Sequence, residues 1–135
     1  RTNTGTLSYF GDTFRHNMED GFPLLTTKKM AVNSMVTELK WFLRGDSHIG
    51  FLLENGCNIW NGDAYKKYQR VVAWDLDEPL SKKEFIDKVK NDKDYWHYGL
   101  LGPIYGTQWR KWGNKEYIDQ IKELIENLKT NPNSM

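Results

Sequence analysis

Residues 28–45 read KKMAVNSMVTELKWFLRG and carry the clearest structural signal in the chain. Apolar side chains recur there at intervals of three and four, the spacing of one face of an α-helix. These positions are Val32, Met35, Val36, Leu39, Phe42 and Leu43. Gly45 is suited to end the helix, because glycine adopts the left-handed backbone conformation at little cost. The pattern predicts a helix over residues 28–44 with one face in a core.

Weaker signals lie on both sides of this helix. Residues 7–18 place apolar and polar side chains in a pattern that favours a strand or one arm of a hairpin. A short helix is predicted over 49–54 and a longer one over 115–129, which Pro132 prevents from continuing. The predicted strands are too few to cover the predicted helices. We therefore expect the sequence to be part of a larger domain.

Residues 61–97 differ in composition from the rest of the chain. Charged side chains are dense and of mixed sign, and apolar residues are sparse. Ser81 and Glu84 have the spacing of a capping box, which predicts a helix start ahead of Phe85. We expect this segment to be an inserted, partly helical excursion on the surface.

Composition excludes several classes of protein. The 135 residues include 19 basic and 18 acidic ones, so binding to nucleic acid through phosphate contacts is not indicated. A single cysteine rules out an intrachain disulfide or a cysteine-rich metal site and favours a reducing compartment. The histidines show no metal-ligand spacing, and no apolar run approaches the ~20 residues of a membrane span. We expect a cytoplasmic protein without a metal or a membrane partner.

Glu38 is the first candidate for chemistry. It lies on the apolar face of the 28–44 helix, three residues after Met35 and four before Phe42, with no cation at ion-pair spacing on that helix. A carboxylate on a core face is costly unless it meets partners, and such groups are candidates for acid–base catalysis. The alternative is a glutamate at the edge of the stripe, held by a distant lysine or arginine.

Two further residues suit a ligand. Arg1 precedes a turn rich in threonine and glycine, and its guanidinium has the planar set of donors that binds a phosphate. Tyr105 lies in the flexible run GPIYG, residues 102–106, which can bring a phenol to a ligand. A buried, hydrogen-bonded tyrosine is an equal alternative.

Other features have a structural interpretation. Cys57 has no histidine or cation nearby in sequence and is expected to be a small apolar filler. Residues 28–54 imitate a helix-turn-helix, but the second helix is apolar, which favours a corner in a core. The run WRKW at 109–112 is expected to pack under a loop.

Taken in order, several runs resemble the thymidylate synthase family. They are RTNTGTLS at 1–8, GFPLLTTKK at 21–29, ELKWFLRGD at 38–46, IW at 59–60, GPIYGTQWR at 102–110, IDQI at 118–121 and NPNS at 131–134. Their order and spacing are jointly specific. The resemblance implies that residues 1–135 are the N-terminal part of one domain, with 61–97 as an insertion whose length the family varies.

The family implies both a fold and a reaction. The fold is α/β (α+β), a large curved sheet covered by helices, and two subunits join sheet to sheet in a homodimer. The reaction is the reductive methylation of dUMP to dTMP in nucleotide biosynthesis. The co-substrate, 5,10-methylenetetrahydrofolate, supplies the carbon and the hydride and leaves as dihydrofolate.

The resemblance also implies roles for single residues. Arg1 matches the arginine that binds the nucleotide phosphate, and Glu38 matches the glutamate that organises water and proton transfer near the pyrimidine. Tyr105 matches an active-site tyrosine beside the nucleophile. Three positions match sites that contact the folate or its glutamate tail: Lys28, Ile59 and Trp60.

The chain departs from the family pattern at several places. The catalytic cysteine, in a Pro-Cys-His setting, would fall beyond Met135, and Cys57 does not replace it. We therefore expect these 135 residues alone to be inactive. Asn61 and Asp63 stand where an acid and an aromatic residue are common, and Ala31 stands where many members have a histidine that contacts folate.

Two alternatives remain open. A pyrimidine nucleotide hydroxymethylase of the same superfamily uses water rather than hydride to quench the transferred carbon. Trp60 favours the synthase, since its side chain would shield the intermediate from solvent. A non-catalytic nucleotide-binding module is the other alternative.

Overall fold

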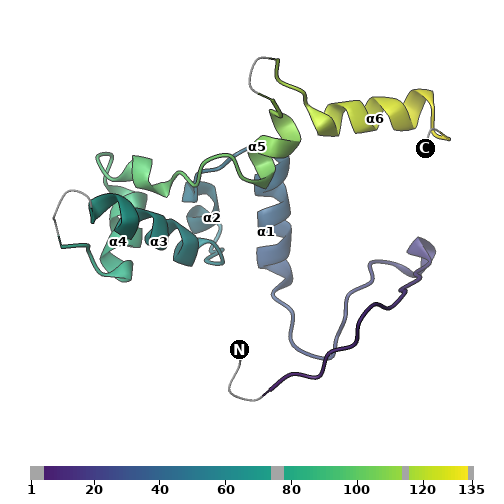
Figure 1. Ribbon diagram of the computed structural model, residues 1–135, viewed down its shortest axis with the longest axis horizontal. Coiled ribbons are helices and arrows are strands. Elements are labelled where there is room, and N and C mark those ends of the chain that lie inside the picture. Colours follow the sequence, from purple (N-terminus) through teal and green to yellow (C-terminus); the bar gives the residue numbers. More distant parts are fainter. Residues whose placement is uncertain (1–4, 74–77, 114–115, 134–135) are drawn as a thin grey trace. The chain divides into compact units, whose positions relative to one another are not determined.

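The computed structural model describes residues 5–73, 78–113 and 116–133. The chain divides into two compact units, residues 1–30 and 31–135, which are described separately. The described residues form a succession of helices (Figure 1). Their bounds are η1 Met18–Asp20, α1 Val32–Leu43, α2 Gly50–Glu54, α3 Asn61–Val72, α4 Lys82–Asn91, η2 Trp96–Gly99, α5 Tyr105–Arg110 and α6 Gln120–Thr130.

The described residues of the first unit, 5–30, are extended apart from the single turn η1. The side chain of Asn17 caps this turn and accepts a hydrogen bond of 3.1 Å from the backbone N–H of Glu19. Leu7 and Phe10 are fully exposed. The strand predicted over residues 7–18 is wrong for the described structure, because no neighbouring backbone accepts its hydrogen bonds and no surface covers its apolar side chains.

Helix α1 confirms the strongest prediction from sequence, although it begins at residue 32 and not at 28, and it buries a different face. Its buried residue is Trp41, whereas the expected core stripe is only partly covered, with 40–49% exposure at Leu39 and Leu43, for example. The reason is that the Trp41 ring packs with Leu52 of α2 and with Cys57. Gly45 adopts φ = 69° directly after the helix, as its place at the end predicts.

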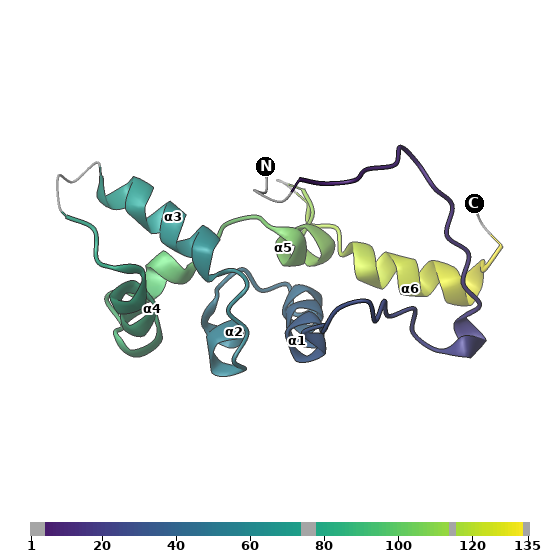
Figure 2. The same cartoon turned by 90° about the horizontal axis from the view of Figure 1, so that it is seen from below.

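Residues 61–97 are partly helical, as expected, but they contribute to the core and do not lie on the surface alone. That this segment is an insertion stays a prediction. These residues form α3 and α4, which pack against each other (Figure 2). The capping box is confirmed, since the Ser81 side chain accepts from the Glu84 N–H and the Glu84 carboxylate accepts from the Ser81 N–H. The apolar residues are few, but their helical spacing gathers them into the larger of two core clusters: Ile49, Leu53, Ala64, Tyr68, Val72, Phe85 and Val89.

The last two helices, α5 and α6, are linked to α1 by a chain of contacts. Helix α5 packs on α1, and α6 contacts α5 (Figure 1). Helix α6 begins five residues later than predicted, because the Asp119 carboxylate caps it by accepting from the Lys122 N–H at 3.0 Å. It buries none of its side chains.

The expected curved sheet is absent from the described part of the chain. The extended segments of these residues make only two isolated antiparallel bridges, His48 with Leu100 and Trp112 with Ile118. A sheet requires several strands that exchange backbone hydrogen bonds, and the described residues do not supply them. This part of the molecule is mostly helical.

Candidate functional site

Glu38 and Trp60 form the centre of the candidate site. Glu38 lies half-buried on α1, and Trp60 is the residue that precedes α3. The indole Nε1–H of Trp60 donates to Oε1 of Glu38 at 2.6 Å. Among the described residues no lysine or arginine forms an ion pair with Glu38. Its partner is a tryptophan, and not the distant lysine or arginine expected for a glutamate at the edge of the apolar stripe.

Aromatic rings surround this pair. We call Trp41, Phe42, Trp60, Tyr105 and Trp109 the aromatic cluster. The ring centroid of Phe42 lies 5.1 Å from Tyr105, 5.6 Å from Trp109 and 6.3 Å from Trp60. Trp60 and Tyr105 are themselves 6.2 Å apart in a T-shaped pair. The structure therefore brings together Glu38, Trp60 and Tyr105, which the sequence offered separately.

The aromatic cluster packs on a small hydrophobic core. Trp41 is 0% exposed, and its Nε1–H donates to the backbone oxygen of His48 at 3.0 Å. Leu52 and Cys57 complete this core. Cys57 is buried with 1% exposure, and its Sγ lies 3.7 Å from the Ser34 carbonyl, in agreement with the predicted filler role.

A glycine lets α5 approach α1 closely enough to place Tyr105. A Cβ on Gly106 would lie 2.6 Å from the backbone oxygen of Asp46 and 3.2 Å from that of Phe42. Only glycine tolerates so short a separation. Arg110 links α5 to both neighbouring helices. It forms an ion pair with Asp119, which caps α6, at 2.9 Å, and donates to the Leu43 carbonyl of α1 at 3.3 Å.

One part of the cluster remains accessible. Tyr105 is 52% exposed, and Ile59, beside Trp60 in sequence, is 51% exposed. Trp60 and Phe42 are half-buried. A carboxylate with one fixed oxygen thus lies next to a partly open aromatic surface. That combination suits a planar ligand whose reaction moves a proton.

Two expected site residues belong to residues 1–30, outside the unit that forms this cluster. Lys28 is exposed and belongs to the first unit. Arg1 lies outside the described residues. Their roles toward a folate tail and a phosphate stay predictions.

Sequence reasoning missed the part played by Phe42 and Trp109. Phe42 was assigned to the buried stripe of α1, and Trp109 to packing under a loop. Both also contribute rings to the cluster, and Phe42 packs on the core of Trp41, Leu52 and Cys57 as well. The available signal was the spacing of four between Glu38 and Phe42, which puts the carboxylate and the ring on one side of the helix.

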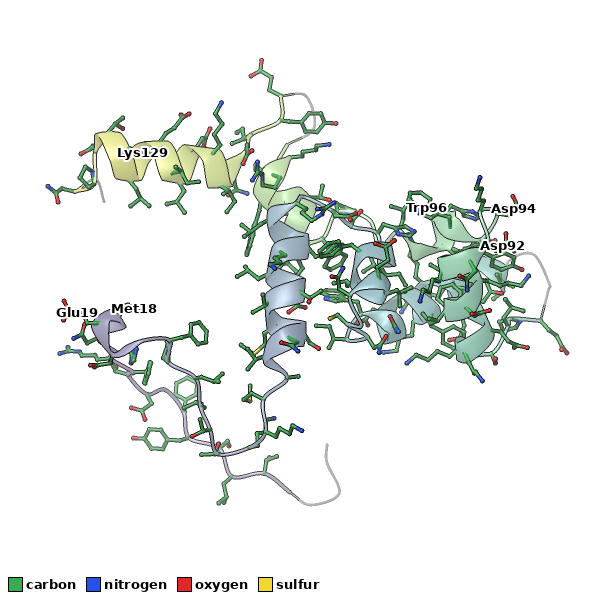
Figure 3. All side chains as sticks on the ribbon, turned by 180° about the vertical axis from the view of Figure 1, so that it is seen from behind. Met18, Glu19, Asp92, Asp94, Trp96 and Lys129 are labelled. Carbon is green, nitrogen blue, oxygen red and sulfur yellow. The ribbon has the colours of Figure 1, made fainter. Side chains whose placement is uncertain are left out.

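His48 has a structural role. Its Nδ1 accepts from the Gly50 N–H at 2.9 Å, so Nε2 carries the proton and donates to the Trp96 carbonyl at 2.7 Å. The imidazole also stacks on the Trp96 ring, with 4.1 Å between centroids. Trp96 lies near Asp92 and Asp94, just after α4 (Figure 3).

The described residues contain neither a candidate metal site nor a candidate membrane span. No three histidine, cysteine or carboxylate side chains there converge as metal ligands. No helix in this part of the chain is long and apolar enough to cross a bilayer.

Comparison with known proteins gives the family. The family model described as thymidylate synthase matches residues 1–135. The thymidylate synthase of Aster yellows witches'-broom phytoplasma (strain AYWB) is 51% identical over 135 residues. Those of Phytoplasma mali (strain AT) and Mycoplasma mobile (strain ATCC 43663) are 47% and 43% identical over 135 residues each.

In all three comparisons, the match covers 99% of this chain and 45% of the relative. The chain therefore belongs to the thymidylate synthase family, as the sequence runs predicted. It spans less than half the length of the curated relatives that it matches.

Proposed function

We propose that the complete protein containing this chain converts dUMP to dTMP with 5,10-methylenetetrahydrofolate and releases dihydrofolate. The observation that supports this proposal is the hydrogen bond from Trp60 to Glu38, inside a cluster that also holds Tyr105. A half-buried carboxylate, an indole and a phenol from three separate elements converge there. Such convergence of polar groups on an aromatic surface is typical of ligand sites.

Glu38 is proposed to organise water and proton transfer at the pyrimidine. Oε1 is held by Trp60, while among the described residues no group donates to Oε2. One oxygen is thus fixed in position and the other is available to a water or a ligand. A carboxylate oriented in this way can accept and return a proton without first losing a salt bridge.

The open side of the cluster is proposed to pack the folate. Ile59, Trp60 and Tyr105 offer apolar and aromatic surface, and a pterin ring is planar enough to stack on it. Lys28 is proposed to lie near the glutamate tail of the folate. Arg1 is proposed to bind the phosphate of the nucleotide.

The nucleophile is proposed to come from another part of the complete protein. Cys57 is unsuited to the role, because it is 1% exposed and packed under the aromatic cluster. The 135 residues alone are therefore expected to be inactive. The curved sheet, the homodimer, the cytoplasmic location and the insertion at 61–97 belong to the same proposal.

The direct test is turnover by the full-length protein. It is incubated with dUMP and 5,10-methylenetetrahydrofolate, and the nucleotide product is identified by mass. We expect dTMP together with dihydrofolate. A 5-hydroxymethyl nucleotide would assign the protein to the hydroxymethylases instead, and unchanged dUMP would leave nucleotide binding as its activity.

A further inference from the structure

Phe42 lies between the residues proposed to act in this site. Its ring meets Trp60 edge to face, with 83° between the planes, and meets Tyr105 at 54°. The centroid separations of 6.3 Å and 5.1 Å fall in the range of favourable aromatic pairs. Trp109 lies 5.6 Å away and limits the room into which the ring can turn.

Helix geometry ties this ring to the carboxylate. Phe42 follows Glu38 by four residues on α1, so both side chains project from one face, about one turn apart. The indole of Trp60 touches the ring of Phe42 and donates to the carboxylate of Glu38. Together with a ring contact from Trp41, also on α1, these two contacts fix the position and the tilt of Trp60.

No other ring on α1 connects the same partners among the described residues. Trp41 contacts Trp60 at 5.5 Å and Phe42 at 5.4 Å but is fully buried and makes no ring contact with Tyr105. A hydrogen bond weakens steeply as its angle worsens. The 2.6 Å bond to Glu38 thus depends on what holds the indole in place.

We propose that Phe42 is a positioning residue, which holds Trp60 and Tyr105 in the orientation that lets the indole bind Glu38. It acts through these two side chains. The proposal rests on the proposed function, because it assigns Phe42 a part in that reaction. Replacing the ring by an aliphatic side chain leaves space beside Trp60 and Tyr105. Both rings can then turn into that space.

The test replaces Phe42 by leucine in the full-length protein labelled with 5-fluorotryptophan. The ¹⁹F resonance of Trp60 is assigned as the one that disappears in Trp60→Phe. In Phe42→Leu we expect this resonance to shift and kcat for dTMP formation to fall roughly 10- to 100-fold, as a misplaced catalytic group predicts. The dissociation constant for dUMP is expected to stay unchanged.

Phe51→Leu is the matched control. Phe51 is also a half-buried phenylalanine, on α2, and its ring lies under Arg44 with 4.7 Å to the guanidinium carbon. This control should alter neither kcat nor the Trp60 resonance. If Phe42→Leu lacks a cooperative thermal transition, Phe42→Met, whose longer and more flexible side chain adapts to the gap, takes its place.

The outcomes separate the two proposals. A loss of kcat without a shift of the resonance overturns the positioning role, and so does a shift without a loss of kcat. Equal behaviour of Phe42→Leu and Phe51→Leu overturns it as well. If the wild type forms no dTMP, the proposed function fails, and the Trp60 resonance alone then decides whether Phe42 orients the indole.

Discussion

The indole of Trp60 donates to the carboxylate of Glu38 over 2.6 Å, although 22 positions separate the two residues in the chain. Glu38 comes from the middle of α1 and Trp60 from the turn before α3. The bond therefore links two elements that share little other polar contact. It also gives a charged side chain on an otherwise apolar part of α1 a specific partner.

Replacing Glu38 by glutamine should reduce kcat far more than it reduces substrate binding. The amide keeps the size of the side chain but cannot take up a proton, and acid–base groups typically contribute ~10²–10⁴-fold. Steady-state kinetics of the full-length enzyme, with dUMP binding measured separately, check this. Glu54→Gln, at the exposed end of α2, is the control and should behave as wild type. An unchanged kcat in Glu38→Gln would make the residue structural.

Trp60→Phe should lower stability as well as turnover. The substitution keeps a ring but removes the N–H that satisfies Oε1 of Glu38. Because both side chains are half-buried, we expect about 1.5 kcal/mol, the low end for a hydrogen bond to a charged group. Denaturant unfolding measures the loss. Trp112→Phe, at a 52% exposed tryptophan, is the reference for the size change alone, and equal losses in both variants would contradict the prediction.

Gly106→Ala should destabilise the contact between α1 and α5. Alanine is the better helix former by ~1 kcal/mol, but here its Cβ would lie 2.6 Å from the backbone oxygen of Asp46, just after α1, and 3.2 Å from that of Phe42 in α1. Overpacking of this kind typically costs ~1–3 kcal/mol, so the clash outweighs the gain.

Gly62→Ala is the matched control for that substitution. Gly62 is also helical, in α3, and the nearest atom to its added Cβ is the flexible Lys82 Nζ at 4.0 Å. This variant should be as stable as wild type or more so. Urea unfolding of both variants decides the question, and a stabilised Gly106→Ala would show that α5 does not approach α1 this closely.

Ser81→Ala should have an effect on stability that depends on pH. Hydrogen bonds from the Ser81 side chain and backbone lower the pKa of Glu84 in the folded protein. The lowered pKa means that this contribution is complete above the unfolded pKa and disappears as pH falls through the folded one. The gap in stability between wild type and Ser81→Ala should therefore be largest near neutral pH and should narrow in acid. A gap that widens in acid would contradict the capping box.

Local patterns predicted the features that depend on neighbours in sequence. The period of residues 28–45 gave α1, and the spacing of Ser81 and Glu84 gave the start of α4. Residues 7–18 failed as a strand, because a strand forms only with a partner whose position the local sequence does not encode. Composition did not reveal that residues 61–97 contribute to the core. Their few apolar residues have helical spacing, but charged residues far outnumber them in the sequence.

By itself, the sequence determined the family, the places of α1, α2, α4 and α6, and the residue types available for chemistry. Those properties follow from short-range order along the chain. Only the tertiary structure decided that Glu38 meets an indole rather than a cation, that Trp41 is the buried side of α1, and that Phe42 joins Trp60 to Tyr105. The physical reason is that each of these contacts links distant elements. How closely these elements approach depends on packing, above all at Gly106. The spacing of apolar residues along the sequence does not reveal it.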